Sequence, residues 1–451
     1  MTDLQLKIPA GACEVLNVLT SAGFEACVVG GCVRDSLLGR EPNDWDICTS
    51  ALPEEVILLF SGERQVIETG MKHGTVTVLM PDGPYEITTF RVDGDYSDHR
   101  HPDRVSFTPS LTEDLARRDF TMNAMAYHPE QGLIDPFHGR EDLKIGLIRC
   151  VGSPAIRFEE DALRMMRAIR FASVFGFELE PETEQAVLGM HALLQKVSAE
   201  RLMAELGKLL MGDGVEEVMM RYRDVIAELI PELKDAFDCT QVTPWHCYPV
   251  YRHIAVSVEK SKKDPLIRLT MLLHDIAKPV CATHEGGKDH FRGHPERGAE
   301  MTDEILKRLK VDSFTRETVT ELVRIHDREV PATVAAARRL LSQIGVEQYS
   351  RLVEVKTADM LAQSEWAIEQ KRDGIRNMRI LAAQILSESA PIALKDLEIN
   401  GEDLLALGMN PGPELGQLLT KLLDSVLEDP SSNKREILLS MAEKLMESTF
   451  A

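Results

Sequence analysis

Basic residues are in the minority in this chain, and it lacks three features that would place it at a membrane or outside the cell. Lys and Arg number 51 against 73 Asp and Glu, which gives a formal net charge of −22. No uncharged apolar run approaches the roughly 20 residues that a membrane-spanning helix needs. The N-terminus has no basic start followed by an apolar run, so it predicts no signal peptide. The eight cysteines form no Cys-x-x-Cys pair, which indicates reduced core thiols of a cytosolic protein.

The shortage of positive charge argues against a protein that coats nucleic acid, because phosphate binding requires Lys and Arg. The basic residues are nevertheless locally dense, and an acidic chain with basic tracts suits transient binding of nucleic acid. These tracts are residues 117–118, 164–170, 338–339 and 371–379.

The length of 451 residues predicts several domains, and 44 % hydrophobic residues suffice to bury their cores. Helix and strand patterns alternate over residues 1–150. Helices are expected at 12–20 and 53–60, and strands at 66–68, 75–80 and 85–90, with a Pro-Asp-Gly hairpin turn at 81–83. Helical periodicity dominates after residue 154. We therefore predict an α/β head over 1–150, and then an all-α neck over 151–238, a helical body over 239–385 and a helical tail over 386–451.

A double glycine separates an apolar strand at 26–29 from a helix that begins near Cys32. Gly30 and Gly31 allow backbone N–H groups to approach a phosphate, and the helix N-terminus adds a partial positive charge. Arg34 lies one turn into the helix, where its guanidinium is expected to reach the same phosphates. The spacing fits neither a Walker loop nor a Rossmann fingerprint.

Paired carboxylates follow this turn. Asp44 and Asp46 are predicted on the next strand, where side chains two residues apart point to one face. Glu86 lies on a strand that is expected to be a neighbour, and is either a third carboxylate of the site or an ordinary edge-strand residue. Convergent carboxylates beside a phosphate site predict two-Mg²⁺ phosphoryl transfer.

Residues 92–109 show no periodicity, and a loop of this length is usually functional. Arg118, Asp119 and Asn123 follow, with the last two predicted one helical turn apart. They are candidates for holding a triphosphate and ribose hydroxyls. The alternative is a helix start with Asp119 as its cap.

Four charged residues then recur at steps of three: Asp161, Arg164, Arg167 and Arg170. On one helix each step turns a residue by about −60°, so Asp161 and Arg164 are neighbours and Arg170 faces nearly the opposite side. Asp161 accepts hydrogen bonds and Arg164 donates them. Cytosine and adenine present an amino donor beside a ring-nitrogen acceptor, so the pair matches them, whereas uracil and guanine present the reverse polarity and are rejected. The alternative is an ordinary surface ion pair.

A second group of ligand-type residues lies in the predicted body. Imidazoles and carboxylates suit one or two transition-metal ions, of which Mn²⁺, Co²⁺ and Ni²⁺ are the candidates. The residues are His253, His274, Asp275, His294, His326 and Asp359.

The motifs of residues 30–35, 44–46, 118–124 and 160–167 together resemble the bacterial class II CCA-adding tRNA nucleotidyltransferases, in the family that also contains bacterial poly(A) polymerases. The likeness covers residues 25–215. It implies a polymerase-β-like head, a neck that selects the incoming base, a body and tail that hold tRNA, and Mg²⁺-dependent addition of CCA to the tRNA 3′ end from CTP and ATP.

In the family, a loop like 92–109 serves the switch to adenylate addition. Residues 65–75 resemble the CCA-adding branch, because poly(A) polymerases carry a basic Arg-Arg-Phe segment there. The second group resembles an HD-domain phosphohydrolase.

Three other functions remain open. One is an A-adding or poly(A) polymerase with the same chemistry. The others are a metal phosphohydrolase whose head senses nucleotide and a non-catalytic RNA-binding module, and the presence of both Asp44 and Asp46 argues against these two. The sequence indicates no oligomeric state.

Overall fold

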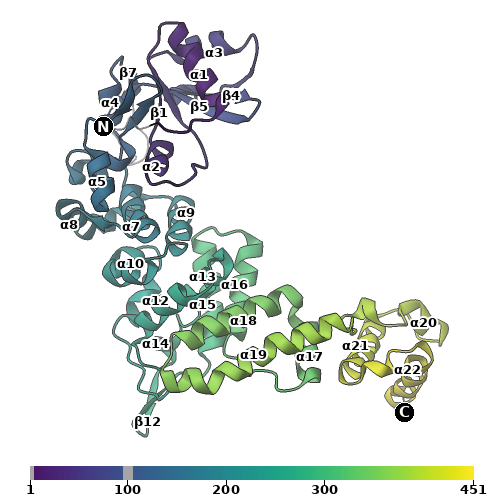
Figure 1. Ribbon diagram of the computed structural model, residues 1–451. Helices are drawn as coiled ribbons and strands as arrows, with labels where there is room; N and C mark the ends of the chain where they lie inside the picture. The colour runs from purple at the N-terminus through teal and green to yellow at the C-terminus, as the bar shows by residue number, and fades with distance from the viewer. Residues whose placement is uncertain (1–4, 95–104, 451) are drawn as a thin grey trace. The chain divides into compact units, whose positions relative to one another are not determined.

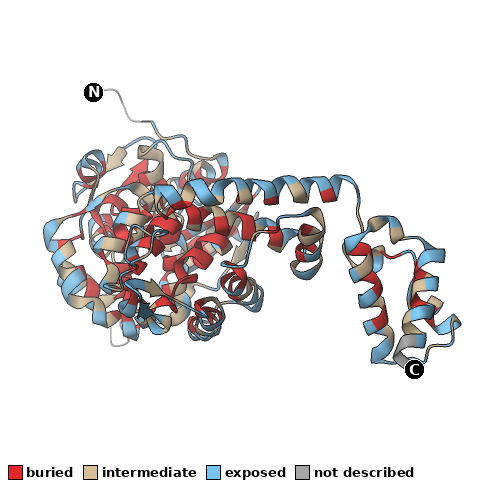
Figure 2. Cartoon of the chain, turned by 90° about the horizontal axis from the view of Figure 1, so that it is seen from below, coloured by how far each residue is buried: buried red, intermediate tan, exposed pale blue. Residues whose placement is uncertain are grey.

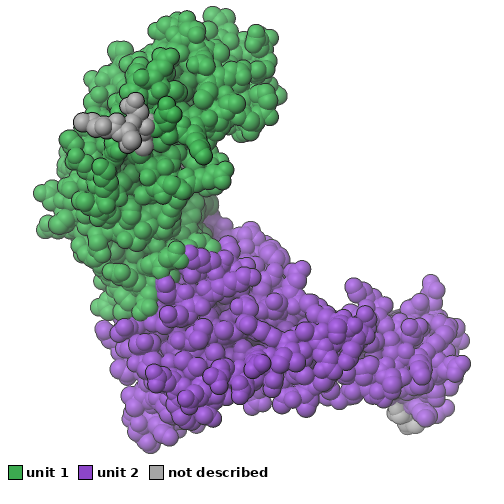
Figure 3. Space-filling model, viewed as in Figure 1, with its two compact units in different colours: residues 1–231 green, residues 232–451 purple. Residues whose placement is uncertain are grey.

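The computed structural model describes residues 5–94 and 105–450, and the chain separates into two compact units, residues 1–231 and residues 232–451 (Figure 3). The first unit holds the expected head and the expected neck as far as residue 231, and the second holds the remaining residues 232–238 of that neck with the expected body and tail. The boundaries expected inside each unit stay predictions. No helix in the described part of the chain is both long and apolar enough to cross a membrane.

Seven strands of the described residues form one mixed sheet in the order β3-β4-β5-β2-β1-β8-β9. β1 is buried along its whole length and pairs antiparallel with β2 and β8, while β2 runs parallel to β5. The strands are β1 (Ala26–Val29), β2 (Ile47–Thr49), β3 (Gln65–Ile67), β4 (Thr75–Met80), β5 (Gly83–Thr89), β8 (Ala126–His128) and β9 (Gly132–Ile134).

Helices cover both faces of this sheet. α1 (Ala10–Ser21) and α3 (Pro53–Phe60) pack on one face, as Figure 1 shows. On the other face, Leu111 and Leu115 of α4 (Leu111–Ala116) pack against Cys27 and Val29 of β1. The predicted helices and the β4–β5 hairpin are confirmed.

The predicted loop at 92–109 is partly regular. β6 (Arg91–Asp93) and β7 (Val105–Phe107) form an antiparallel pair, so the two ends of the loop meet as a ribbon. Short β-rich segments of this kind carry no periodicity that a sequence reveals. Residues 95–104, in the middle of the loop, lie outside the described residues.

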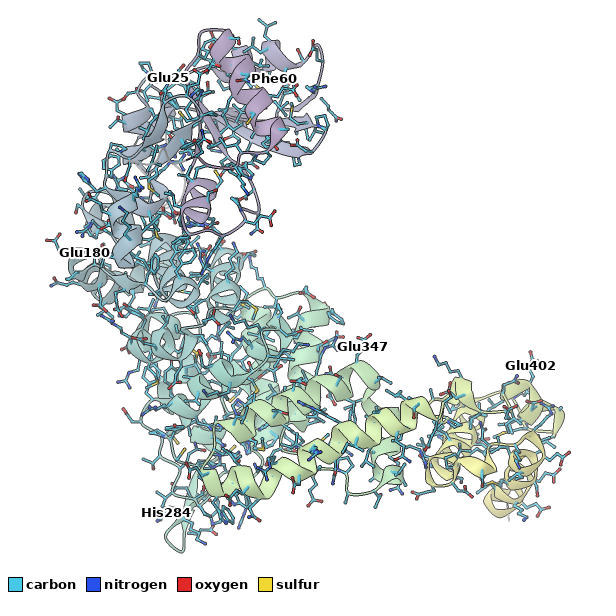
Figure 4. The ribbon with its side chains drawn as sticks, in the orientation of Figure 1. Glu25, Phe60, Glu180, His284, Glu347 and Glu402 are labelled. Carbon is cyan, nitrogen blue, oxygen red and sulfur yellow. The ribbon has the colours of Figure 1, made fainter. Side chains whose placement is uncertain are left out.

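The rest of the first unit is mainly helical, with one short parallel pair of β10 (Leu147–Ile148) and β11 (Glu178–Leu179). Glu180, labelled in Figure 4, caps α8 by accepting a 2.8 Å hydrogen bond from the Thr183 backbone N–H. The helices are α2 (Gly31–Leu37), α5 (Gly139–Ile145), α6 (Pro154–Glu160), α7 (Leu163–Phe175), α8 (Pro181–Met190), α9 (Ala199–Leu210), α10 (Val215–Arg221) and α11 (Arg223–Ala227).

The second unit is also mainly helical, with one hairpin of β12 (Thr283–Glu285) and β13 (Lys288–His290). Its helices are α12 (Val250–Lys260), α13 (Pro265–Leu273), α14 (Lys278–Cys281), α15 (His294–Arg308), α16 (Ser313–Ile325), α17 (Val334–Ile344), α18 (Val346–Leu361) and α19 (Glu365–Ser387). Within this body α15 packs on α16, and α13 packs on both α12 and α16.

The tail has a core of its own, in which α20 (Gly401–Ala406), α21 (Pro413–Glu428) and α22 (Arg435–Phe450) pack together. Leu404, Leu422 and Leu438 are fully buried there, and the buried faces of these helices turn toward one another in Figure 2. The tail therefore folds around its own apolar contacts.

Candidate functional site

The three candidate catalytic carboxylates lie at one end of the central sheet. β2 begins at Ile47, so Asp44 and Asp46 precede the strand rather than lying on it as predicted. Ile47 pairs with Ile87 of β5, which places Glu86 beside Asp46 on the neighbouring strand as expected. The sheet register therefore brings the carboxylates together.

Asp46 is open to solvent but sits among other charged groups. Partial loss of hydration raises the pKa of its carboxyl group, and the negative charges of Asp44 and Glu86 raise it further, against the opposing effect of Arg118. The resulting pKa is about 6. A cation among these carboxylates would remove the repulsion, and carboxylate oxygens are the ligands that Mg²⁺ prefers. The residues present therefore fit a divalent cation.

The double glycine forms a tight turn between β1 and α2. Gly30 has φ 82° and ψ −125°, a conformation that other residues rarely adopt. Its N–H donates to the Met125 carbonyl at 3.0 Å, and a methyl group in its place would lie 3.0 Å from Arg118 Nη1. At Gly31 a methyl group would lie 3.6 Å from Arg34, an ordinary contact.

Arg34, which was expected to reach the phosphates, is a buried residue. Its guanidinium donates to Asn123 Oδ1 at 2.6 Å and to Asp35 Oδ1 at 2.8 Å. The same group lies 5.0 Å from the centre of the Phe171 ring and 5.1 Å from that of Phe175. Arg34 thus ties α2 to the neck helix α7 while one side of it still lines the cavity described below.

Asp119 joins three elements. Its carboxylate accepts from the Phe120 N–H at 2.8 Å, from Asn123 Nδ2 at 3.0 Å and from Arg167 Nε at 2.7 Å. Burial would raise its pKa, but Arg167, Asn123 and Arg164 outweigh that effect and lower it to about 2. Asn123 ends a short 3₁₀ turn (Thr121–Asn123). Asp119 is therefore a buried anion that fixes two cavity-lining side chains.

The prediction that the four charged residues at positions 161, 164, 167 and 170 lie on one helix is wrong. α6 ends at Glu160, Asp161 has extended backbone (φ −142°), and α7 begins at Leu163. The Asp161 Oδ1 accepts from the N–H of Leu163, the first residue of α7, at 3.1 Å. Its Oδ2 accepts from Arg201 at 2.7 Å, whereas Arg164 donates to Glu160 at 2.6 Å.

This break lets residues that a straight helix would separate face one cavity of about 430 Å³. All the predicted nucleotide-binding residues line it, and so does Asp46, whereas Asp44 lines a different pocket. Among the described residues, arginines outnumber aspartates in its wall by seven to three, which suits a polyphosphate. The arginines are Arg34, Arg117, Arg118, Arg164, Arg167, Arg170 and Arg201.

Four lining residues of the cavity were not among the predicted site residues: Arg117, Leu163, Phe171 and Arg201. Arg201 comes from α9, and no local motif indicates that this helix packs on α7. Phe171 lies 3.7 Å from the Arg170 guanidinium, measured to the ring centre. The basic pair at residues 117–118 was a signal for Arg117, but nothing beside Arg201 in the sequence pointed to the site.

The second unit brings together the six ligand-type residues of the body. His253 lies on α12, His274 ends α13, and His326 ends α16. The Nε2 atoms of His253 and His274 are 3.3 Å apart, as are those of His294 and His326. The first pair belongs with Asp359 and the second with Asp275, and in each set the ligand atoms lie within 4.8 Å of one another.

Hydrogen bonds fix the orientation of all four imidazoles. A carbonyl oxygen only accepts, so each Nδ1 donates its proton, and the Nε2 lone pair is left facing the centre of the cluster. Two such lone pairs at 3.3 Å repel each other unless a cation lies between them. The carbonyls belong to Ala362, Met271, Phe291 and Val323 for His253, His274, His294 and His326 respectively.

Asp275 lies between the two sets, 3.2 Å from His274 Nε2 and 3.5 Å from His294 Nε2. The buried ammonium of Lys278 lies 2.7 Å from Asp275 Oδ2 and donates to Gln241 at 2.8 Å. Burial and the charge of Lys278 lower the pKa of His246 to about 3, so this neutral imidazole accepts from Lys278 at 3.2 Å. Lys278 therefore holds Asp275 in place.

The sheet, the carboxylates at its end and the arginine-lined cavity define the sheet-bearing part of the first unit as the head of a nucleotidyltransferase. A family model described as "Poly A polymerase head domain" matches residues 26–149. Two further models match residues 176–237 ("Probable RNA and SrmB- binding site of polymerase A") and residues 297–442 ("tRNA nucleotidyltransferase domain 2 putative"). The fold is a polymerase-β-like head followed by a largely helical chain, and nucleotidyltransferases of this fold use divalent metal ions.

The particular family follows from full-length relatives. The chain is 36 % identical to the CCA-adding enzyme of Lactobacillus helveticus over 96 % of both chains. It is 35 % identical to that of Enterococcus faecalis over 96 % of this chain and 95 % of the relative. The structure of the Bacillus stearothermophilus CCA-adding enzyme in complex with CTP covers 97 % of this chain and 98 % of that one, with 28 % identity and a TM-score of 0.72. The chain belongs to the family of CCA-adding enzymes.

Proposed function

We propose that this enzyme restores the 3′-terminal CCA of tRNA from CTP and ATP without a nucleic-acid template. The observation that carries the proposal is the cavity in which Asp46 meets seven arginines of the described residues. A divalent cation at the carboxylates would stabilise the charge that develops on the transferring phosphoryl group. The eight free thiols fit a reducing compartment, so we expect the enzyme to act in the cytosol.

Each part of the cavity has a role in this proposal. Asp44, Asp46 and Glu86 hold the divalent cations, for which Mg²⁺ is the candidate. The turn at Gly30 and Gly31 and the arginines hold the triphosphate. Asp119 and Asn123, which line the wall beside them, are assigned to the ribose and to positioning. Asp161, Arg164, Arg167 and Arg170 face the incoming base and its phosphates.

The experiment that tests this function offers three tRNA substrates, ending before CCA, after the first C and after CC, with CTP or ATP supplied singly and together. We expect C addition to the first two and A addition only to the third. A protein that adds only A, or that extends a run of A residues, would instead be an A-adding enzyme or a poly(A) polymerase.

The histidine cluster supports a second activity, metal-dependent phosphohydrolysis in the manner of an HD domain. Four Nε2 lone pairs and two carboxylates converge there, which is a donor set for Mn²⁺, Co²⁺ or Ni²⁺. A bound ion would supply hydroxide near neutral pH. His253, His274 and Asp359 would hold one ion and Asp275, His294 and His326 another.

The test of this second activity is metal-dependent hydrolysis of phosphate monoesters and 2′,3′-cyclic nucleotides by the full chain. Metal analysis of the protein incubated with Mn²⁺, Co²⁺ or Ni²⁺ gives a readout that is independent of activity. His274→Ala should lose both metal and hydrolysis while retaining CTP and ATP incorporation with Mg²⁺. Wild-type protein that binds none of these ions would refute the assignment.

A further inference from the structure

A cavity of about 490 Å³ opens over the histidine cluster in the second unit, and its size lies within the range of small-ligand pockets, about 300–1,000 Å³. Asp275, His294, His326 and Asp359 lie in its wall. A molecule in this cavity therefore sits against the proposed metal ligands.

The charged side chains that line the cavity indicate which chemical group of a bound ligand would lie next to the histidine cluster. Of the described lining residues, four aspartates face three cationic side chains, Lys278, Arg292 and Lys371, so the cavity alone repels anions. Lys278 has its ammonium engaged by Asp275, Gln241 and His246. Two divalent cations at the cluster would reverse the sign of the charge. The cavity then accepts a phosphate group at its metal end.

A partly exposed aromatic residue, Trp245, indicates what the rest of such a ligand would contact. Trp245 lines the cavity and has 38 % of its surface exposed. Trp366 packs against it with the ring centres 4.6 Å apart, and the Lys371 ammonium lies 5.6 Å from the centre of the Trp245 ring. Trp245 is thus supported by a second aromatic ring and contributes part of its exposed surface to the cavity wall.

The backbone holds Trp245 in register with the metal ligands. Its carbonyl accepts from the Ser364 N–H at 3.0 Å, and Ser364 Oγ donates to the Pro244 carbonyl at 2.7 Å. Ser364 follows the end of α18, the helix that carries Asp359. His246, which follows Trp245 in the sequence, contacts the ring of His253 with the ring centres 5.1 Å apart. These contacts fix the position of the Trp245 ring relative to the histidine cluster.

We propose that Trp245 is the nucleobase-stacking residue of this cavity, so that a nucleotide whose phosphate reaches the histidine cluster rests its base on this ring. The proposal rests on the phosphohydrolase activity proposed above and assigns the residue that would hold the base of a nucleotide substrate. Bases stack on aromatic side chains whatever their identity, so we expect little preference among adenine, guanine, cytosine and uracil.

The binding test uses the full chain with Trp45→Phe and Trp366→Phe. The sequence has three tryptophans, so Trp245 is then the only one left. Adenosine 2′-monophosphate, titrated with Mn²⁺ present, should quench its fluorescence in a saturable way. Without Mn²⁺ the quenching should weaken at least tenfold, because the cavity then repels phosphate. Glycerol 2-phosphate, which has no base, should leave the fluorescence unchanged.

The kinetic test compares Trp245→Leu and Trp245→Ala with wild type and with Trp366→Phe, which keeps an aromatic ring behind Trp245. Both Trp245 variants should raise KM for adenosine 2′-monophosphate about tenfold and leave KM for glycerol 2-phosphate unchanged. An unchanged KM for the nucleotide, or an equal loss for both substrates, would overturn the stacking role. If wild type hydrolyses neither substrate, the phosphohydrolase proposal fails, and saturable quenching alone then decides whether Trp245 stacks a base.

Discussion

At the scale of single residues, Gly30 and Gly31 are adjacent but should respond differently to the same change. Gly30→Ala forces a side chain into φ 82°, ψ −125° and should lower the free energy of unfolding by about 1–3 kcal/mol. Gly31→Ala meets only an ordinary contact and should not destabilise the fold. Its methyl group would instead enter the cavity wall and raise KM for CTP and ATP. Urea denaturation and nucleotide kinetics measure the two effects, and equal destabilisation by both variants would contradict this account of the turn.

Asp119 makes the stability of the first unit depend on pH. Its pKa falls from 3.8 to about 2 on folding, so its ion pair with Arg167 is fully stabilising above pH 3.8 and is lost as pH drops through 2. We expect a loss of up to about 2 kcal/mol in unfolding free energy over that window.

Asp119→Asn should be less stable at neutral pH and should lose this part of the acid dependence. Urea denaturation followed by Trp45 fluorescence, with both tryptophans of the second unit replaced by Phe, reports on the first unit alone. A wild-type protein and variant with parallel pH profiles would show that Asp119 contributes nothing to the acid sensitivity.

Residues in local motifs were predictable, and residues placed by packing were not. Four residues could be recognised from their local motifs: Gly30, Gly31, Asp119 and Asn123. The glycines form a turn between consecutive elements, and the Asp119 carboxylate accepts hydrogen bonds from Phe120 and Asn123, its near neighbours in sequence. Arg201 was missed because it reaches Asp161 only when α9 packs on α7. The role of Arg34 as a buried tie to Asn123 was missed for the same reason.

At the scale of elements, the break between α6 and α7 places Asp161 in the cavity, and base choice should depend on it. Asp161→Ala removes a carboxylate that demands an amino donor from the base, so the preference for CTP over UTP should fall by about 10- to 100-fold. Glu159→Ala removes a neighbouring carboxylate that is not among the lining residues of the cavity and serves as the matched control. An unchanged preference in the Asp161 variant would leave it only as the partner of Arg201.

The contact between α9 and α7 makes a separate prediction. A methyl group at Gly212, just after α9, would lie 2.1 Å from Ser173 Oγ and 2.4 Å from the Ser173 carbonyl oxygen, so Gly212→Ala should cost about 1–3 kcal/mol of stability. Gly207 lies within α9 with open space around it, and Gly207→Ala should stabilise by about 0.5–1 kcal/mol. Thermal denaturation compares the two, and a stable Gly212→Ala protein would show that this contact can relax.

Helix and strand periodicity predicted the elements of the first part of the head, because an amphipathic strand or helix shows its own buried face in the sequence. The hairpin of β4 and β5 is an example, whereas α4, α5, β8 and β9 were not predicted. The same reasoning joined α6 and α7 into one helix, since charges at steps of three look continuous, although the Asp161 side chain accepts a hydrogen bond from the Leu163 N–H at the start of α7. The β6–β7 ribbon was missed because three-residue strands are too short to show alternation.

At the scale of the whole molecule, the two candidate sites lie in different compact units and depend on different ligands. Oxygen ligands in the first unit suit Mg²⁺, and imidazoles in the second suit transition metals. Neither set shares a residue with the other. We therefore expect nucleotide addition and phosphohydrolysis to be separable by single substitutions.

The most direct measurement of the central claim is the single-turnover rate of C addition to tRNA lacking CCA, with CTP and Mg²⁺, for wild type, Asp46→Ala and His274→Ala. Asp46→Ala should lose at least about a thousandfold in rate, because a metal ligand supplies several kcal/mol of transition-state stabilisation. It should bind tRNA nearly as well as wild type in a filter-binding assay, and His274→Ala should add C at the wild-type rate. Retention of more than about a tenth of the rate by Asp46→Ala would contradict the assignment of the reaction to these carboxylates.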